Sequence, residues 1–484
     1  MHRAAAFATL LLGISLFGAG CTGDVSPKKN VLMMIADDQG MDMGAYGSKV
    51  VQTPNQDRLA EQGVRFTNAF ATVASCSASR SVILTGLFNH TNGQYGHAHS
   101  YHNLHTLPHV QSLPFLLREA GYRTGIVGKF HVNPASRFPF DYQAPAKELG
   151  GNRNVAAMAE SAKTFLSRPE DRDKPFFLLI GYSDPHRSGQ GFANDRDYPG
   201  VEAVQYSPDE VELPSHLPDT PETRQEMAEY YQAVSRLDQG IGMMLNVLEE
   251  TGHGQDTLIF FFSDNGIPFA GAKTNLYDPG IHLPFLVSSP EQSRQGVVNN
   301  AMVSYIDLVP TILDWTGAAQ PTYELPGRSI LPILEEENPK GWDEVYLSHT
   351  FHEITMYYPT RGLRTRRYKY LKNLYPELSF PHASDLYASK TWQSILKGKL
   401  THMGARRTQD YLQRPAEELY DLENDPEEVK NLAGDPRHAE LIKKFRGRLL
   451  DFQKRTDDPW ARSAAEWGEF LFGSGSDPNR VPGN

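Results

Sequence analysis

The stretch Val31-Leu-Met-Met-Ile-Ala-Asp-Asp38 is a continuous apolar run that stops at two carboxylates. An apolar run of this length without alternation is typical of a strand buried on both faces, as in a parallel sheet. Three further runs have the same form and also end in polar residues: Gly125–Gly128 before Lys129 and His131, Phe176–Ile180 before Asp184-Pro185-His186, and Leu258–Phe262 before Asp264 and Asn265. Four such runs predict a large parallel sheet.

Segments with helical periodicity lie between these runs. From Met227 to Leu248 apolar residues recur at helical spacing, and Gly252 follows as the expected C-cap. Alternating buried strands and helices predict a doubly wound α/β sheet. Ligands of such sheets bind at the carboxyl ends of the strands. We therefore expect seven polar side chains to converge on one edge: Asp37, Asp38, Lys129, His131, His186, Asp264 and Asn265.

The C-terminal part has a different pattern. After about residue 335 the apolar runs are shorter and alternate with polar residues, which predicts a small antiparallel sheet from Val345–Leu347, Arg361–Thr365, Tyr368–Leu371 and Glu418–Leu422. A helix near 437–455 is expected to close this part. The expected organisation is a catalytic α/β domain over 26–335, an α+β subdomain over 336–472, and a loose tail rich in Gly, Ser, Pro and Asn over 473–484.

The composition is that of an ordinary globular protein. The chain has 484 residues, of which 39% are hydrophobic and 22% charged, which excludes a fibrous or wholly disordered protein. Its net charge of −11 argues against non-specific nucleic-acid binding, so an anionic ligand would need a local basic pocket. Only two cysteines occur, Cys21 and Cys76, which argues against a disulfide scaffold.

Residues 1–21 have the form of a secretory signal peptide. A basic start at Arg3 precedes the apolar run Ala4–Phe17, which is shorter than the ~20 residues of a membrane-spanning helix. Small residues directly before Cys21 also resemble a bacterial lipoprotein signal, in which Cys21 would become the acylated N-terminus, although Gly18 stands where such signals usually carry Leu. We expect export from a bacterial cytoplasm, either to the periplasm or to a membrane-anchored state.

Two pairs of oxygen ligands follow predicted strands. Asp37 and Asp38 form one pair, and Asp264 and Asn265 form the other. Hard oxygen ligands favour Ca²⁺, with Mg²⁺ as the alternative, over zinc, which prefers His and Cys. Either pair alone could simply cap the next helix. Because both pairs stand at predicted strand ends, the sequence predicts one divalent metal site.

The segment around Cys76 carries the strongest local motif. Cys76-Ser-Ala-Ser-Arg80 is followed by Leu84-Thr-Gly86, and together they resemble the signature of the sulfatase family. A lone cysteine is often only a small buried apolar residue, but that interpretation leaves Arg80 and the Leu-Thr-Gly element unexplained. In the family that it resembles, a maturation enzyme oxidises this cysteine to Cα-formylglycine in the unfolded chain. Ala78 stands where many members have Pro.

The resemblance extends over nearly the whole mature chain and implies an alkaline-phosphatase/sulfatase-like fold. Further sulfatase landmarks occur in the expected order: Asp37-Asp38-x-Gly40, Gly128-Lys129-x-His131, Asp184-Pro185-His186, Ser263-Asp-Asn-Gly266 and Glu418-Leu-Tyr-Asp-Leu422. Within the family the chain is most similar to the sulfamidases, the N-sulfoglucosamine sulfohydrolases of heparan degradation, on stretches such as Asn92–Gly96, Thr274–Tyr277 and Pro310–Trp315. Lys273 departs from that pattern, because sulfamidases carry Arg there and O-sulfatases commonly carry Lys.

The resemblance also implies roles for individual residues. Formylglycine at position 76, as its hydrate, would attack sulfur through one hydroxyl, with Cys76 thereby counted among the metal ligands beside Asp37, Asp38, Asp264 and Asn265. Arg80, Lys129 and Lys273 would neutralise the sulfuryl charge. His186 would protonate the leaving group, and His131 would deprotonate the second hydroxyl to expel sulfate.

A second group of residues is predicted to recognise the sugar. It consists of His90 and His97, from a histidine-rich segment, and of His352, Glu353 and Arg361. The guanidinium of Arg361 has the planar fork that suits a uronate or sulfate. Metal binding or simple solvation are the other interpretations of a histidine-rich segment.

The expected function is an exported hydrolase of the N-sulfate of glucosamine in saccharides from heparin or heparan sulfate. An O-sulfatase acting on another glycan is the alternative within the class. Phosphomonoester or phosphodiester hydrolysis on the same fold is a weaker one, because zinc-dependent relatives need more His ligands. A glycan-binding lipoprotein without activity would result if Cys76 were never converted. The oligomeric state stays open, with a homodimer as one option.

Overall fold

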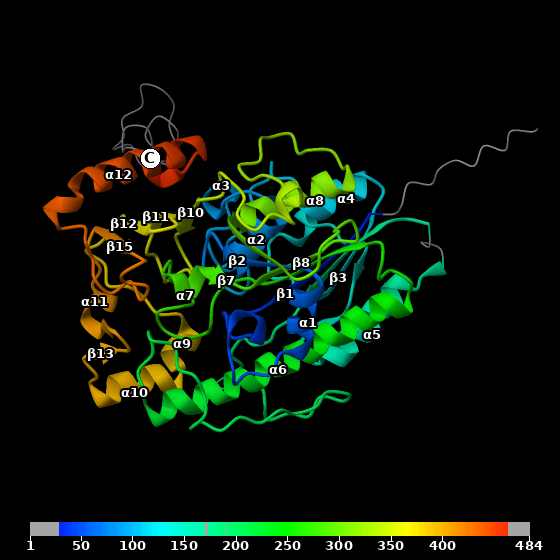
Figure 1. Cartoon of the computed structure of the whole chain (residues 1–484), viewed down its shortest axis with the longest axis horizontal. Helices are drawn as coiled ribbons and strands as arrows, with labels where there is room; N and C mark the ends of the chain where they lie inside the picture. The colour runs from blue at the N-terminus through cyan, green and yellow to red at the C-terminus, as the bar shows by residue number, and fades with distance from the viewer. Residues whose placement is uncertain (1–28, 170–172, 190, 463–484) are drawn as a thin grey trace, which may run out of the picture.

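The computed structural model describes residues 29–169, 173–189 and 191–462 (Figure 1). The predicted signal peptide with Cys21 and the predicted tail over 473–484 lie outside these residues. Within the described ranges, no helix has the length and apolarity needed to cross a bilayer.

The parallel centre of a nine-stranded sheet organises the larger part of the chain. Four neighbouring strands run in parallel in the order β3 (Arg123–Gly128), β5 (Phe176–Gly181), β1 (Asn30–Ala36) and β6 (Thr257–Ser263). Met33 of β1 stands in register between Leu179 and Phe260. These strands are the four apolar runs of the sequence, so the predicted parallel arrangement is confirmed here.

The other half of the sheet is mixed, and the four apolar runs of the sequence made no prediction about it. β8 (Phe285–Ser288) is antiparallel to β6, and β2 (Val64–Phe70) is antiparallel to β8 and parallel to β9 (Val297–Ser304). Parallel neighbours are usually joined by a crossover through a full α-helix, whereas the connection from β6 to β8 contains no helix longer than the single-turn α7 (Asp278–Ile281). Two short strands complete the sheet: β4 (Tyr142–Gln143) and β7 (His282–Leu283).

Helices cover both faces of the large sheet, as a doubly wound fold requires (Figure 1). One face packs on α2 (Cys76–Thr85), α4 (Leu113–Glu119) and α8 (Leu308–Thr316), and the other packs on α1 (Pro54–Gln62), α5 (Val155–Leu166) and α6 (Pro221–Glu250). Alternate residues of β1 point to opposite cores, because a strand presents successive side chains to opposite faces. Gly252 lies just beyond α6 in the left-handed conformation, with φ of 79°.

The C-terminal part forms the predicted antiparallel sheet. Its strands are β10 (Glu344–His349), β11 (Thr360–Thr365), β12 (Tyr368–Asn373) and β15 (Glu417–Asp421), in that order. The closing helix is α12 (Ala439–Arg455), whose Phe445 and Leu449 pack with Leu363 and Tyr370 of the sheet. The remaining α-helices and strands of the described residues are short: α3 (Asn89–Asn92), α9 (Ser384–Ala388), α10 (Lys390–Gly398), β13 (His402–Met403), β14 (Arg406–Arg407) and α11 (Thr408–Leu412).

The small sheet packs against the large one. Leu347 and Leu371 of the small sheet share an apolar core with Phe70 and Met302 of the large sheet. This packing brings the loop after β10 and the helix α9 to the carboxyl ends of the parallel strands. The domain boundary near residue 335 stays a prediction.

Candidate active site

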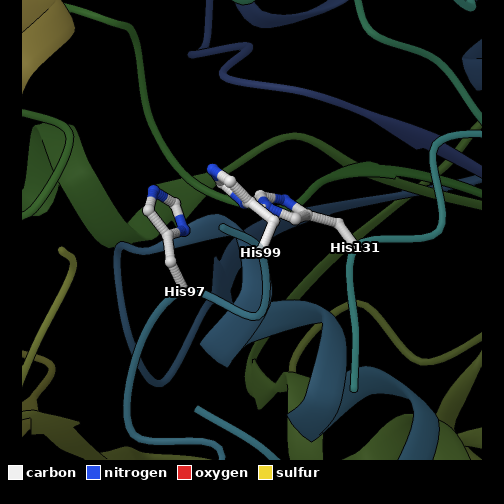
Figure 2. Close-up of side chains that lie close together, drawn as sticks. All are labelled: His97, His99 and His131. Atoms are coloured by element: carbon white, nitrogen blue, oxygen red, sulfur yellow. The ribbon is translucent and has the colours of Figure 1, made fainter. Parts of the chain in front are cut away.

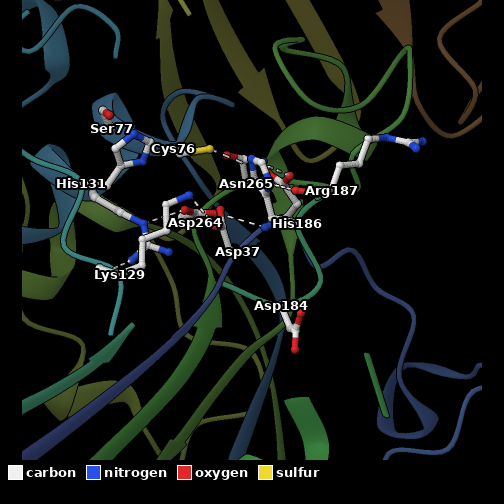
Figure 3. A network of polar contacts seen from close by, with 12 residues as sticks. Asp37, Cys76, Ser77, Lys129, His131, Asp184, His186, Arg187, Asp264 and Asn265 are labelled. Atoms are coloured by element: carbon white, nitrogen blue, oxygen red, sulfur yellow. Dashed lines mark hydrogen bonds and ion pairs between the residues drawn. The ribbon is translucent and has the colours of Figure 1, made fainter. Parts of the chain in front are cut away.

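The carboxyl ends of the parallel strands bring the predicted polar residues together. Asp37 and Asp38 follow β1, Lys129 follows β3, His186 lies beyond β5, and Asp264 and Asn265 follow β6. Figure 3 shows Asp37, Lys129, His131, His186 and Asp264 around Cys76. The sequence therefore placed these residues at the correct edge of the sheet.

Three carboxylates form the base of the site. Oxygens of Asp37, Asp38 and Asp264 lie within 4.8 Å of one another, and all three side chains are buried. The backbone N–H of Asp38 donates to Asp264 Oδ1 over 3.2 Å, and Asn265 Nδ2 donates to Asp38 Oδ1 over 2.6 Å. Asp38 has φ of 69°, a left-handed conformation that aspartate tolerates better than most residues.

The electrostatics of these carboxylates fit a divalent cation. Burial, together with the neighbouring carboxylates, raises the pKa of Asp38 to about 6 and the pKa of Asp264 to about 7. Burial would also raise the pKa of Asp37, but the ammonium of Lys129 holds it well below its usual range. Asp37 Oδ1 and Asn265 Oδ1 are buried and accept no hydrogen bond. Hard oxygen donors with unused lone pairs are what Ca²⁺ and Mg²⁺ bind.

Cys76 begins α2 beside this cluster. Its side chain is 0% exposed, and its Sγ lies 3.9 Å from Asp38 Oδ1. Burial raises the pKa of the Cys76 thiol well above its usual value, so the thiol is protonated at neutral pH. One helical turn later, Arg80 donates through Nε to Asp264 Oδ2 over 2.8 Å, while its Nη2 is buried without a hydrogen-bond partner.

Lys273 is a buried cation between two carboxylates. Its Nζ lies 2.9 Å from Asp38 Oδ2 and 2.9 Å from Asp385 Oδ2. Asp385 belongs to α9, and no feature of the surrounding sequence marked it as a site residue. Burial opposes ionisation of Asp385, but Lys273 holds the pKa of Asp385 well below its usual range.

His186 presents one ring nitrogen to the same carboxylates. Its Nδ1 donates to the carbonyl oxygen of Arg187 over 2.6 Å, which leaves Nε2 unprotonated in the neutral ring. That Nε2 lies 3.8 Å from Asp38 Oδ2 and 3.9 Å from Asp385 Oδ2. Burial, followed by the charge of Lys273, lowers the pKa of His186 to about 3.

Two neighbours of His186 hold the loop in place and lie outside the cavity. Arg187 points away from the cluster in Figure 3 and pairs with Glu226 over 2.6 Å. Asp184 binds the guanidinium of Arg236 at 2.6 and 2.8 Å and also pairs with Arg153. The Asp-Pro-His-Arg stretch therefore contributes only His186 to the cavity.

A cavity of about 330 Å³ opens above these groups. Lys129, His186, Lys273 and Asp385 line it, and so do three of the residues predicted to recognise sugar: His97, His352 and Glu353. A larger hollow of about 710 Å³ lies between α1, α6 and β8, and contains none of the predicted catalytic residues. The smaller cavity is therefore the candidate active site.

Two residues predicted to recognise sugar do not reach the cavity, which corrects that expectation. His90 is buried and engages both ring nitrogens, with Ser348 Oγ at 2.7 Å and Thr456 Oγ1 at 2.8 Å. Arg361 is also buried and forms a two-pronged ion pair with Asp458 at 2.7 and 3.0 Å. Both side chains hold the C-terminal segment against the rest of the fold.

Comparison with known proteins identifies the family. The sulfatase family model matches residues 29–318, which is more than half of the chain. The chain belongs to the sulfatase family. A second model, described as N-sulphoglucosamine sulphohydrolase, C-terminal, matches residues 271–389. The family and the fold that the motif around Cys76 implied are thereby confirmed.

Individual relatives agree with this membership. The chain is 41% identical over 462 residues to the N-sulphoglucosamine sulphohydrolase of Homo sapiens, covering 89% of this chain and 91% of that protein. It is 28% identical over 440 residues to an ulvan-active sulfatase of Formosa agariphila, covering 90% and 82%. The expectation of a sulfatase similar to N-sulfoglucosamine sulfohydrolases is confirmed.

Solved structures show the same fold at lower identity. One is a protein in complex with its substrate D-glucosamine-2-N,6-O-disulfate, with a TM-score of 0.65 and 22% identity, covering 89% of this chain and 99% of that one. Another is the phosphonate monoester hydrolase of Agrobacterium radiobacter, with a TM-score of 0.65 and 19% identity, covering 89% and 96%. Since one fold carries different chemistries, the substrate has to be argued from the site.

Proposed function

We propose that this chain is a sulfamidase that hydrolyses the N-sulfate of glucosamine in saccharides derived from heparin or heparan sulfate. The proposal is carried by the cluster around Cys76, in which buried carboxylates and cations meet, in a chain 41% identical to a human N-sulphoglucosamine sulphohydrolase. An N-sulfate is an anion on a nitrogen leaving group. The site therefore has to bind negative charge and deliver a proton.

Cys76 is proposed to act only after conversion to formylglycine. Its thiol is held protonated by burial, and a protonated thiol is a poor nucleophile. Hydrated formylglycine would supply one hydroxyl for attack on sulfur and a second for expulsion of sulfate. Since Cys76 is fully buried in the folded chain, the maturation enzyme has to reach it before folding is complete.

The carboxylate cluster is proposed to hold Ca²⁺, with Mg²⁺ as the alternative. Asp37, Asp38, Asp264 and Asn265 would supply oxygen ligands, with residue 76 facing the same ion. Bound there, a dication would polarise the nucleophilic hydroxyl. It would also offset the mutual repulsion that raises the pKa values of Asp38 and Asp264.

Three cations are proposed to bind the sulfuryl oxygens. These are Arg80, Lys129 and Lys273, which all lie beside the carboxylate cluster. Four carboxylates pair with them: Asp37, Asp38, Asp264 and Asp385. Counting these four negative and three positive groups, the site has a formal charge of minus one alone and plus one with a bound dication. A net positive site suits a sulfate monoanion, and fixed cations in a buried site stabilise the charge that develops during transfer.

Two histidines are proposed to move protons. His186 Nε2 faces the cavity and would carry the proton to the leaving nitrogen. His131 is neutral because burial lowers its pKa well below the usual value, so it can accept a proton from the second hydroxyl. Its buried Nδ1 has no hydrogen-bond partner in the resting protein, which leaves that atom available.

The cavity wall is proposed to recognise the sugar. His97, His352 and Glu353 line the cavity above the reacting groups, so a saccharide with its sulfate at the base would contact them. His352 is oriented by Ser75, whose Oγ lies 2.9 Å from its Nδ1. An O-sulfatase is the second candidate, favoured by one observation, namely that a lysine stands at position 273.

Sulfate release from a panel of saccharides tests the proposal. The matured protein should release sulfate from N-sulfoglucosamine much faster than from 6-O-sulfated N-acetylglucosamine, while Cys76→Ala should release none from either. Release from the 6-O-sulfated sugar alone would overturn the sulfamidase assignment and support the O-sulfatase. If Cys76→Ala were as active as the unmodified chain, the assignment of residue 76 as the nucleophile would be wrong.

The last part of the proposal concerns where the protein acts. Residues 1–21 are proposed to direct the chain out of the cytoplasm, with Cys21 as the acylation site if the lipoprotein signal is used. Labelling of cells with a fatty acid, followed by comparison of the chain with its Cys21→Ala variant, distinguishes an anchored protein from a free periplasmic one.

A further inference from the structure

Three histidines form a second cluster on the wall of the same cavity. Figure 2 shows His97, His99 and His131, and we call this group the imidazole cluster. One ring nitrogen from each lies within 4.8 Å of the others. His97 and His99 come from the loop after α3, and His131 comes from the loop after β3, so two distant segments build the cluster.

The three rings are close enough to share one ligand. Ring centroids are 4.8 Å apart for His97 and His99, 5.1 Å for His97 and His131, and 4.8 Å for His99 and His131. His99 Nδ1 and His131 Nε2 are 2.7 Å apart, so they share one proton in a hydrogen bond. A cation placed among the three nitrogens would replace that single proton.

Their chemistry favours a transition metal over Ca²⁺. Burial lowers the pKa of all three rings, so they are neutral near pH 7, and neutral imidazole is the form that binds metal. Tetrahedral zinc with bonds of about 2.0–2.1 Å places its nitrogen ligands roughly 3.4 Å apart. The His99–His131 pair at 2.7 Å is closer than that value, and no nitrogen of the set is more than 4.8 Å from another, so small movements of the rings would reach it.

The surroundings of the cluster already hold one of its three histidines, His97, in place. The backbone N–H of His97 donates to the carbonyl of His352 over 2.8 Å, and Ser77 Oγ lies 3.5 Å from His97 Nδ1. Groups that hold ligating histidines in this way tune metal sites. His131 Nδ1 is buried without a hydrogen-bond partner, so the ring can turn without breaking a bond at that atom.

We propose that His97, His99 and His131 form a second metal site for a transition-metal dication such as Zn²⁺, and that its occupation stops hydrolysis. All three residues line the active-site cavity, so three protein ligands would leave a coordination position open toward substrate. The inhibitory part rests on the proposed function, in which His131 accepts a proton. A metal bound to His131 would remove that base.

Cobalt provides a spectroscopic probe that does not depend on activity. Titration of the matured, Ca²⁺-saturated protein with Co²⁺ should produce the visible absorption of tetrahedral cobalt and saturate at one ion per chain. Zn²⁺ should then bleach it by displacement. His99→Gln should weaken cobalt binding by more than the ~10–100-fold that loss of an outer partner of a metal ligand costs.

His105→Gln is the matched control. His105 lies in the same histidine-rich segment but is exposed and outside the cluster. The His105→Gln variant should bind cobalt with the same affinity as the unmodified chain. The assignment of the site would be overturned if His99→Gln bound cobalt as tightly as the unmodified chain, or if the absorption were typical of six oxygen ligands.

Activity separates the two parts of the proposal. Zn²⁺ should inhibit sulfate release over the same concentration range in which it bleaches cobalt, and excess Ca²⁺ should not relieve the inhibition. Zinc binding at this site without inhibition would overturn the inhibitory role. Failure to hydrolyse any sulfated saccharide would count against the proposed function and leave the cobalt result to decide the site.

Discussion

Replacing His186 with alanine should slow cleavage of a sulfamate far more than cleavage of an aryl sulfate. The amine of N-sulfoglucosamine has to leave with a proton, whereas nitrophenolate leaves without one. His186 Nε2 faces the cavity, and its Nδ1 is held by the carbonyl of Arg187 at 2.6 Å, so only Nε2 can deliver that proton. A general acid contributes ~10²–10⁴-fold, which is about 2.7–5.4 kcal/mol of transition-state stabilisation.

The lowered pKa of His186 adds a dependence on pH. With its pKa at about 3 in the free enzyme, His186 is neutral near pH 7, and its protonated fraction rises about tenfold for each unit by which the pH falls. Since kcat/KM reports the free enzyme, kcat/KM for the sulfamate should rise relative to the aryl sulfate by roughly 100-fold between about pH 7 and about pH 5.

The assay measures kcat/KM for N-sulfoglucosamine and nitrophenyl sulfate across this range, in saturating Ca²⁺. His186→Ala should remove both the preference and its pH dependence, and the exposed His105→Gln should change neither. Equal losses for both substrates would show that His186 binds the sulfuryl group instead. A ratio that does not vary with pH in the unmodified enzyme would refute the assignment of His186 as the acid.

Four further outcomes are expected. Asp385→Asn should lower kcat/KM about 10–150-fold, because a charged hydrogen bond worth about 1.5–3 kcal/mol no longer fixes Lys273; steady-state kinetics with an unchanged melting temperature would show this. Removal of Ca²⁺ by a chelator should abolish turnover and lower the melting temperature, and added Ca²⁺ should restore both, whereas full activity of verified metal-free protein would contradict the metal site. Tryptic peptides of active protein should carry an aldehyde at position 76, and activity from unmodified Cys76 alone would contradict the mechanism. Burial in the folded chain lowers the pKa of His90 from 6.5 to about 3, so the unfolded chain binds more protons at acid pH. The free energy of unfolding should therefore fall as the pH falls below about 6.5. Denaturant unfolding at about pH 5 should show a loss of up to ~2 kcal/mol, and His90→Gln should reduce that loss.

The strands of this fold could be predicted where burial on both faces makes the local sequence continuously apolar. Strands β1, β3, β5 and β6 are buried on both faces, so their sequences are continuously apolar and end sharply at polar residues. Because parallel strands share an edge, the positions of Asp37 and Asp264 followed directly. The closing helix α12 was equally visible, since one face of it is apolar and the other charged.

The mixed half of the sheet has no comparable signal in the sequence. In β2, buried positions are interrupted by half-buried Arg65, Thr67 and Asn68, so the run is broken. The register between β2 and β9 also shifts between Phe66 and Asn68, which disrupts any simple alternation. Pairing of this kind depends on neighbours that are distant in sequence.

In the C-terminal part, the prediction that Arg361 recognises the sugar was wrong because its charge is buried in an ion pair. Arg361 has the chemistry of an anion-binding residue, and only the position of Asp458, 97 residues later, shows that its charge is already neutralised. Asp385 is the opposite case, an ordinary aspartate that becomes a site residue because α9 packs beside Lys273, 112 residues earlier. Neither relationship can be read from local spacing.

The arrangement around Lys273 bears on what a lysine at this position means for substrate choice. An arginine would offer a planar fork, whereas lysine offers a point charge on a flexible stem. Here that charge is fixed by two carboxylates at 2.9 Å each, Asp38 from the carboxylate cluster and Asp385 from α9, and the side chain is fully buried. A point charge held this firmly can contact a sulfuryl oxygen whether the sulfate hangs from nitrogen or from oxygen. Discrimination between the two then has to come from the group that protonates the leaving atom, which is why the response of His186→Ala to the two substrates decides the assignment.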